Sequence, residues 1–459
     1  MSLTVSILLA IGLGVIGWIA ARAKASRFAG DGTAATRPHS LPGYHGWFVA
    51  ASMILPALLF VSAWSAVTPG LVTERVLTSA AAQSLPSDPL ERATIIGEAR
   101  GLASGQMEAA FNPQAEALAP AFTEARNFYG MVGIALTLLL AFAFGAWAYT
   151  RLTPAFRART RVERIVMLVL LTASLIAILT TAGIVASLLF ESLRFFAQVN
   201  VFDFLFGTRW SPQAATQGDL KALGAVPLFW GTIFIGAIIA MIVAIPIGLM
   251  TAIYLTQYAA ASVRRWMKPL IEILAGVPTV VYGYFAALTV APRVRDFAVM
   301  LGIPGASTES ALAAGLVMGI MIIPFVSSMA DDSIAAVPQS MRDGSLAMGA
   351  TTSETIRKVI VPAALPGIVG GVLLAVSRAI GETMIVVMAA GLAANMTANP
   401  FASVTTVTTQ IVKLLTGDQE FDSAKTLAAF ALGLVLFIVT LLLNIVALRV
   451  VKRYREAYD

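Results

Sequence analysis

The chain has 459 residues, of which 58% are hydrophobic and 12% are charged, and its mean hydropathy is +0.83. This composition excludes an ordinary water-soluble fold, in which about a quarter of the residues are charged. The net charge of +6 favours basic loops that face anionic lipid over nucleic-acid binding, and the absence of Cys excludes disulfides, thiolate metal sites and thiol catalysis.

Apolar runs of about 20 residues, long enough to cross a hydrocarbon core of about 30 Å, recur along the chain. They predict an all-α polytopic membrane bundle of about nine transmembrane helices. The predicted spans are 2–21, 46–67, 128–150, 165–190, 226–256, 266–291, 310–336, 364–391 and 426–451. The first is predicted to be a retained anchor and not a cleaved signal peptide, because its apolar run is long and no positive charge precedes it.

The Lys and Arg residues gather in alternate loops, and loops with such an excess face the cytoplasm. These loops comprise residues 22–37, 151–164, 264–268, 342–358 and 449–455. The N-terminus is therefore predicted outside and the C-terminus in the cytoplasm. A segment near 68–126, rich in Ala and more acidic than basic, is then external, and we expect it to be helical.

Two formal charges, Arg378 and Glu382, stand four residues apart in the apolar span 364–391. A charge at the bilayer centre costs about 2.5–3.5 kcal/mol, whereas an i,i+4 ion pair on a helix contributes only about 0.2–0.5 kcal/mol. Both must therefore face the bundle interior or a wet cavity. Two interpretations stay open, an interhelical lock and an anion pathway in which the planar Arg fork binds two anion oxygens. Thr383 and Tyr282 are further candidates, as hydrogen-bond donors to a passing anion.

The segment PQSMRDGSLAMGATTSETIRKVIVPAALPGI, residues 338–368, predicts two short helices interrupted by Gly349. A surface hairpin with no partner and a compact knob gripped by a partner both fit this pattern. Gly349 is expected to need a backbone conformation or a close approach that a side chain would block. Asp331 and Asp332, just before this segment, are interpreted as a solvated helix end. Pro278 is expected to kink the span 266–291.

This segment resembles the cytoplasmic coupling loop of ABC importer permeases, whose pattern is Glu-Ala-Ala, then Gly, an aliphatic residue and Pro. The corresponding residues are Asp343, Gly344, Ser345, Gly349, Val359 and Pro362, and the first three depart from the pattern. Three further stretches, GAVPLFWGTIFIGAIIAMIVAIPIGLMTAIYLTQYA (224–259), KPLIEILAGVPTVVYGYF (268–285) and SRAIGETM (377–384), resemble the permease of the high-affinity phosphate (Pst) importer, PstC type. The resemblance covers about residues 165–455.

The resemblance implies a six-span type I permease core over residues 165–459, preceded by an extension, residues 1–164, with about three spans. It implies ATP-driven import of inorganic phosphate across the bacterial cytoplasmic membrane by alternating access. Arg378 and Glu382 are then tied to phosphate translocation, and the loop 338–362 docks into a groove of an ATPase. The implied partners are a PstA-type permease, a PstB-type ATPase dimer and a PstS-type phosphate-binding protein.

No G-x-x-x-x-G-K-[ST] motif occurs, so ATP and Mg²⁺ are expected in a separate ATPase subunit. We expect this chain to be no enzyme, with no catalytic residue, bound cofactor or metal site of its own. Two alternative functions stay open. One is an ABC permease for another oxyanion, such as sulfate or molybdate. The other is a gradient-driven secondary transporter, which would not need a coupling loop.

Overall fold

The computed structural model describes residues 3–28, 39–416 and 423–454. Their regular structure is helical, apart from one isolated β-bridge between Trp210 and Leu223. Within these ranges, eight helices are long and apolar enough to cross a membrane, and one bent pair raises the number to nine. The prediction of an all-α membrane bundle is therefore confirmed. Of the basic loop residues, Arg37 and Arg455 lie outside the described ranges.

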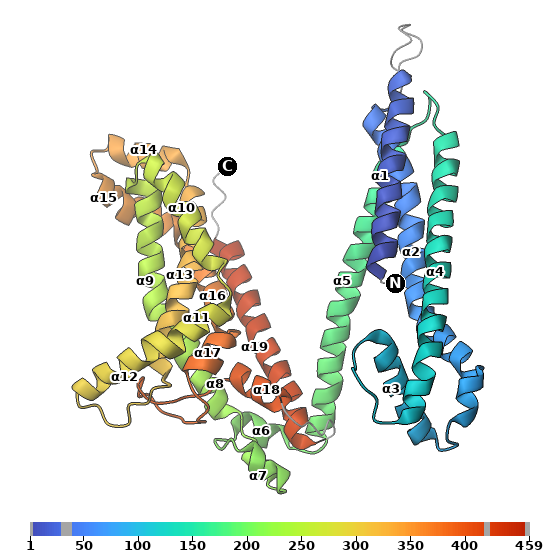
Figure 1. The fold of residues 1–459 in the computed structure, drawn as a ribbon. Helices are drawn as coiled ribbons and strands as arrows, with labels where there is room; N and C mark the ends of the chain where they lie inside the picture. Colours follow the sequence, from blue (N-terminus) through green and yellow to red (C-terminus); the bar gives the residue numbers. More distant parts are fainter. Residues whose placement is uncertain (1–2, 29–38, 417–422, 455–459) are drawn as a thin grey trace. The chain divides into compact units, whose positions relative to one another are not determined.

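The chain divides into two compact units, residues 1–179 and 180–459 (Figure 1). The division falls inside a single long helix, α5 (Ala158–Phe196). The predicted boundary between residues 164 and 165 lies in the same helix and stays a prediction.

Three spans, α1 (Leu3–Arg27), α2 (Pro42–Leu77) and α4 (Pro113–Thr150), pack side by side in the first unit (Figure 1). Small residues bring these helices close together, as is usual where apolar helices associate in lipid. A Cβ atom on Gly145 of α4 would lie 2.7 Å from the Met53 side chain of α2. Glycine at this position therefore lets the two backbones approach.

Between α2 and α4 the chain forms a helical cap, made of a 3₁₀ turn (Ala80–Ser84) and α3 (Pro89–Ser104). The Asp88 carboxylate accepts a hydrogen bond from the Leu90 N–H and begins α3, and Gly105, at φ +76°, ends it. One face of α3 packs on α4 through Ile95, Ala99, Leu118 and Phe122. The expected helical structure of the segment near 68–126 is thus present.

The second unit begins with the C-terminal part of α5, continues with short helices and contains the spans that follow. Its α-helices are α6 (Val201–Phe206), α7 (Pro212–Thr216), α8 (Val226–Thr232), α9 (Ala240–Ile253), α10 (Ala261–Ala275), α11 (Thr279–Phe285), α12 (Ala291–Met300), α13 (Ala311–Ala335), α14 (Gln339–Ala347), α15 (Thr352–Thr355), α16 (Val361–Ile380), α17 (Met384–Ala389), α18 (Val407–Leu415) and α19 (Ala424–Tyr454). A 3₁₀ turn spans Leu220–Ala222, and π-helical stretches span Ile233–Ile239, Tyr254–Tyr258, Ala286–Val290 and Ile356–Ile360.

Helix α13 forms the centre of the second unit, with α9 and α16 packed against it. It is the most buried of the spans. A Cβ atom on Gly319 of α13 would lie 2.8 Å from the Val243 side chain of α9, so glycine again sets the helix spacing. This core holds the C-terminal end of α16 and the chain that follows it in place.

Two predicted spans are interrupted. Instead of a kink at Pro278, the chain breaks between α10 and α11 with a bend of 84°. Proline lacks an N–H and disfavours a helical conformation of the residue before it, here Val277. The span predicted over 364–391 ends at Ile380, and α17 begins only at Met384. The prediction of one continuous helix through Arg378 and Glu382 was therefore wrong.

Candidate functional site

Arg378 occupies the last turn of α16, and its side chain is exposed. The next residue, Ala379, is buried in the core, because successive residues of a helix point in different directions. The guanidinium carbon lies 5.9 Å from the centre of the Phe325 ring of α13. No described carboxylate lies within ion-pair distance of Arg378. The structure therefore presents a cation without a counterion at the end of a span.

Glu382 stands in the turn between α16 and α17 and does not pair with Arg378. Its Oε1 accepts a hydrogen bond from the Met384 N–H at 3.1 Å, so the carboxylate helps to hold the turn. The Thr383 hydroxyl donates to the Gly381 carbonyl at 3.4 Å. An i,i+4 arrangement on a helix is absent because Gly381, a poor helix former, ends α16 and the Glu382 side chain bonds to backbone instead. Whether these residues contact an anion stays a prediction.

A group of hydroxyl side chains, which sequence reasoning missed, supports this turn. The Thr408 hydroxyl donates to the Glu382 carbonyl at 2.8 Å. The Thr406 hydroxyl lies 3.0 Å from the hydroxyls of both Thr408 and Thr409, and all three residues are buried. The sequence did contain a signal for this group, because five of the six residues in the stretch TTVTTQ, 405–410, are polar. Polar groups that become buried require hydrogen-bond partners, so such a stretch indicates a local hydrogen-bond network.

Tyr282, the remaining pathway candidate, lies in α11 and is buried. Its hydroxyl donates to the Leu274 carbonyl of α10 at 2.8 Å. A tyrosine has one O–H donor, so in this structure it bridges the break between α10 and α11. Donation to an anion would require that bond to open.

The segment predicted as a coupling loop forms a knob, which we define as residues 338–362. Asp343, Gly344 and Ser345 lie on α14, and Gly349 follows it. Val359 and Pro362 lie where the π-helical stretch runs into α16.

Internal hydrogen bonds shape the knob. Ser345 of α14 and Thr355 of α15 are joined through their hydroxyls at 2.9 Å. Thr351 begins α15 in a capping box with Glu354. Gly349 has φ +85°, and nothing lies within 4 Å of a Cβ built there. The glycine is therefore required by its backbone conformation and not by a close approach.

The outer surface of the knob carries apolar side chains. Met348 is 89% exposed and Leu346 is 41% exposed, and they lie beside Gly349. Exposed apolar side chains gathered on a small helical projection are typical of a protein interaction site. Such side chains would suit contact with a partner, and whether the knob binds one stays a prediction.

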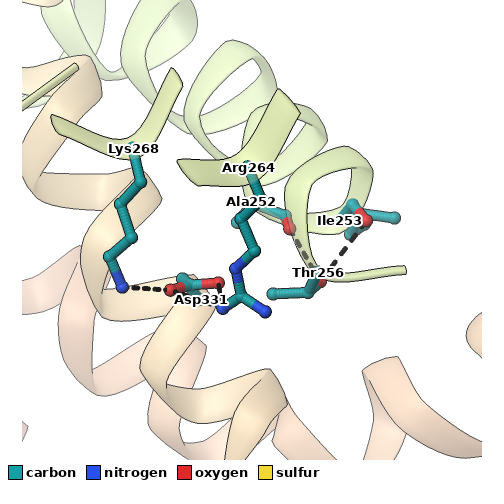
Figure 2. A network of polar contacts seen from close by, with 6 residues as sticks. All are labelled: Ala252, Ile253, Thr256, Arg264, Lys268 and Asp331. Atoms are coloured by element: carbon teal, nitrogen blue, oxygen red, sulfur yellow. Dashed lines mark hydrogen bonds and ion pairs between the residues drawn. The ribbon is translucent and has the colours of Figure 1, made fainter. Parts of the chain in front are cut away.

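A polar network joins α10 to α13 near the knob (Figure 2). Asp331 is buried, and its carboxylate accepts hydrogen bonds from Arg264 Nη2 at 3.0 Å and from Lys268 Nζ at 2.6 Å. The interpretation of Asp331 as a solvated helix end was wrong, because the two cations of α10 cover it. Its neighbour Asp332 is exposed. Since α13 leads into α14 within a few residues, the network ties α10 to the base of the knob.

Comparisons with known proteins agree with this architecture. Residues 244–456 match the family described as "Binding-protein-dependent transport system inner membrane component", and residues 5–180 match "Phosphate ATP-binding cassette transporter". The first match contains α13, the knob and α16. Together they define the class of protein: an inner-membrane permease of an ABC transporter, a non-catalytic membrane component.

Similar proteins place the chain within that class. "Probable ABC transporter permease protein YqgH" of Bacillus subtilis is 32% identical over 53% of this chain and 75% of its own length. "Phosphate transport system permease protein PstC" of Mesorhizobium japonicum is 31% identical over 64% of this chain and 88% of its own length. A "Probable phosphate transport system permease protein PstC" of Methanocaldococcus jannaschii is 29% identical over 53% and 80%. The chain belongs to the PstC-like family of ABC transporter permeases.

Proposed function

We propose that this chain is the PstC-type subunit of an ATP-driven importer of inorganic phosphate. Arg378 carries the proposal. A cation at the end of a span is costly in hydrocarbon, so it must face water, a ligand or another subunit. A guanidinium without a carboxylate keeps its planar fork available for the oxygens of a phosphate. Relatives named as phosphate permeases support the choice of anion.

The path would run beside the turn at 381–383, on the exposed side of α16. Glu382 and Thr383 lie in this turn and Tyr282 holds the neighbouring helix break, so all four predicted pathway residues keep a role in the proposal. A PstA-type permease would cover the exposed side and complete the path. A PstS-type protein would deliver phosphate from outside the membrane.

The knob would be the docking site of a PstB-type ATPase dimer, which would bind ATP and Mg²⁺. Closure of the ATPases would move the knob, and α13 would transmit the movement to α10 through Asp331. The knob would accordingly face the cytoplasm. Because the chain has no Cys, thiol labelling can test this orientation. Ser353→Cys in the knob should resist an impermeant reagent in intact cells, whereas Gln106→Cys should react, and the reverse pattern would overturn the orientation.

Phosphate uptake in a strain that lacks this chain tests the function directly. We expect uptake to be lost, to return when the chain is restored, and to depend on an ATPase that copurifies with it. Uptake of sulfate or molybdate in place of phosphate would favour another oxyanion permease. Restored phosphate uptake with no copurifying ATPase would favour a gradient-driven transporter.

A further inference from the structure

The first unit contains a cavity of about 310 Å³ between α1, α2, α3 and α4, far from the knob and from Arg378 in sequence. Sites for small molecules occupy about 300–1,000 Å³, so this volume suffices for a ligand or for part of a larger one. Its walls include the apolar side chains of Val61, Val72, Phe122 and Ile134. Arg100 of α3 and Arg126 of α4 also line it, and both are exposed. The cavity is thus lined by apolar side chains, neutral polar side chains and two cations.

Both arginines keep donors free. Arg100 Nη2 donates to the Thr73 hydroxyl at 2.9 Å, and Arg126 Nη1 donates to the Ala103 carbonyl at 3.2 Å. These acceptors are neutral, and within the described ranges no carboxylate forms an ion pair with either arginine. Glu98, an acidic residue of α3, instead accepts a hydrogen bond from the Asn112 N–H at 3.1 Å. A guanidinium has five N–H donors, so an anion between the two arginines would find several.

The aromatic residues at the cavity are of the kind expected at the edge of a bilayer. Trp64 lines it and donates its indole N–H to the Tyr129 carbonyl at 3.2 Å, and the Tyr129 ring lies 5.3 Å from that of Phe128. Trp and Tyr concentrate at the level of the lipid headgroups. The same residues stand where the apolar stretches of α2 and α4 give way to the polar cap. At that level the apolar walls would meet the upper acyl chains and the arginines would meet the phosphates.

We propose that this cavity binds a phospholipid, with its phosphate between Arg100 and Arg126 and the start of an acyl chain against the apolar walls. Inorganic phosphate would use the arginines but gain nothing from the apolar surface, whereas a phosphodiester lipid matches both. Bound there, the lipid joins α3 of the cap to α2 and α4 of the membrane bundle. Neither the site nor its test depends on transport of phosphate.

Native mass spectrometry of the purified, delipidated full-length chain with added phosphatidylglycerol tests the proposal. We expect one retained lipid per chain. Arg100→Gln and Arg126→Gln should each weaken its retention at least about tenfold, since each removes a charge-assisted hydrogen bond to the lipid phosphate. Arg92→Gln is the matched control, because Arg92 is an exposed arginine of α3 that does not line the cavity. Arg126→Lys should retain most of the lipid.

Further arms separate the two halves of the site. Ser65→Phe places a larger side chain at the cavity wall and leaves both arginines in place, and it should reduce lipid retention. Diacylglycerol, which lacks a phosphate, should bind weakly and equally in wild type and in the Gln variants. Equal lipid retention in Arg100→Gln, Arg126→Gln and Arg92→Gln would overturn the proposal. So would arginine-dependent retention of inorganic phosphate that Ser65→Phe leaves unchanged. Should a Gln variant unfold, Ser65→Phe and the comparison of phosphatidylglycerol with diacylglycerol on the wild-type chain decide the outcome.

Discussion

The second unit holds two groups of charges that are built in opposite ways. Asp331 lies 67 residues from Arg264 and 63 from Lys268, yet it bonds both (Figure 2). Arg378 and Glu382 lie four residues apart and do not bond each other. The Asp331 carboxylate is buried and hydrogen-bonded to both cations, which fits a structural link between two helices. Arg378, in contrast, is exposed and has no carboxylate partner among the described residues, which leaves its guanidinium available to a ligand. Distance along the chain therefore does not indicate which charges are structural.

The largest effect on stability is expected from Asp331→Asn. Breaking a buried ion pair costs about 3–5 kcal/mol, and we expect about 3 kcal/mol because both cations are 39% exposed and stay partly solvated. Equilibrium unfolding of the full chain in mixed micelles measures this loss. Asp332→Asn removes the same charge from an exposed neighbour and should change stability by less than about 0.5 kcal/mol. Equal effects of the two substitutions would contradict the structural role of Asp331.

Arg378→Ala should have the opposite profile, with unchanged stability and impaired transport. Removal of charged hydrogen bonds worth about 2 kcal/mol predicts a fall of roughly thirtyfold in phosphate uptake. Arg378→Lys keeps the charge but loses the planar fork and should recover part of the rate. Arg293→Ala in α12 is the control, since Arg293 is another exposed arginine of this unit, and among the described residues its guanidinium bonds to the Thr289 carbonyl. Normal uptake by Arg378→Ala at normal abundance would remove this residue from the path.

A smaller effect on ATPase association is expected from a substitution in the knob. It tests whether Gly349 acts through its backbone conformation or through surface contact. Gly349→Ala places a side chain at φ +85° and should cost about 1–2 kcal/mol of local stability. We expect a several-fold loss of copurified ATPase and of uptake. Gly344→Ala is the matched control, because Gly344 lies on α14 with nothing within 4 Å of its Cβ position and without a positive φ. Gly349→Asn should retain more function than Gly349→Ala, since Asn tolerates this region better. The reverse ranking would count against the backbone explanation.

The smallest effect, on selectivity, is expected from Glu382→Gln. The amide oxygen can still accept the Met384 N–H, so the turn should persist while the negative charge is lost. Near neutral pH phosphate keeps a proton that a carboxylate can accept, whereas sulfate offers none. We expect phosphate flux to be largely retained and the preference for phosphate over sulfate to fall a few-fold in reconstituted vesicles. Since a binding protein also selects, the assay requires a complex that transports without one. An unchanged preference would leave Glu382 as a residue that only holds the turn.

Most spans could be predicted from the sequence because a helix that crosses lipid must be predominantly apolar, although the predicted spans 266–291 and 364–391 are interrupted. The conformation of Gly349 was also within reach, as its place between two short helical patterns favours a left-handed residue. The break after Ile380 could not be predicted, because a single glycine often stays helical and the hydrogen bond that the Met384 N–H donates to the Glu382 carboxylate is visible only in the structure. The partners of Asp331 were equally hidden, although Arg264 and Lys268, four residues apart, were a hint that one helix face carries two cations.

The internal bonds of the knob have a consequence for how fast it can be recognised. Ser345 is tied to Thr355, and Thr351 to Glu354, before any partner arrives. A surface that is already ordered loses little conformational entropy when it binds, so encounters need not wait for folding. In the proposed transport cycle the knob would bind and release an ATPase repeatedly, and a surface ordered in advance would avoid refolding at each binding event.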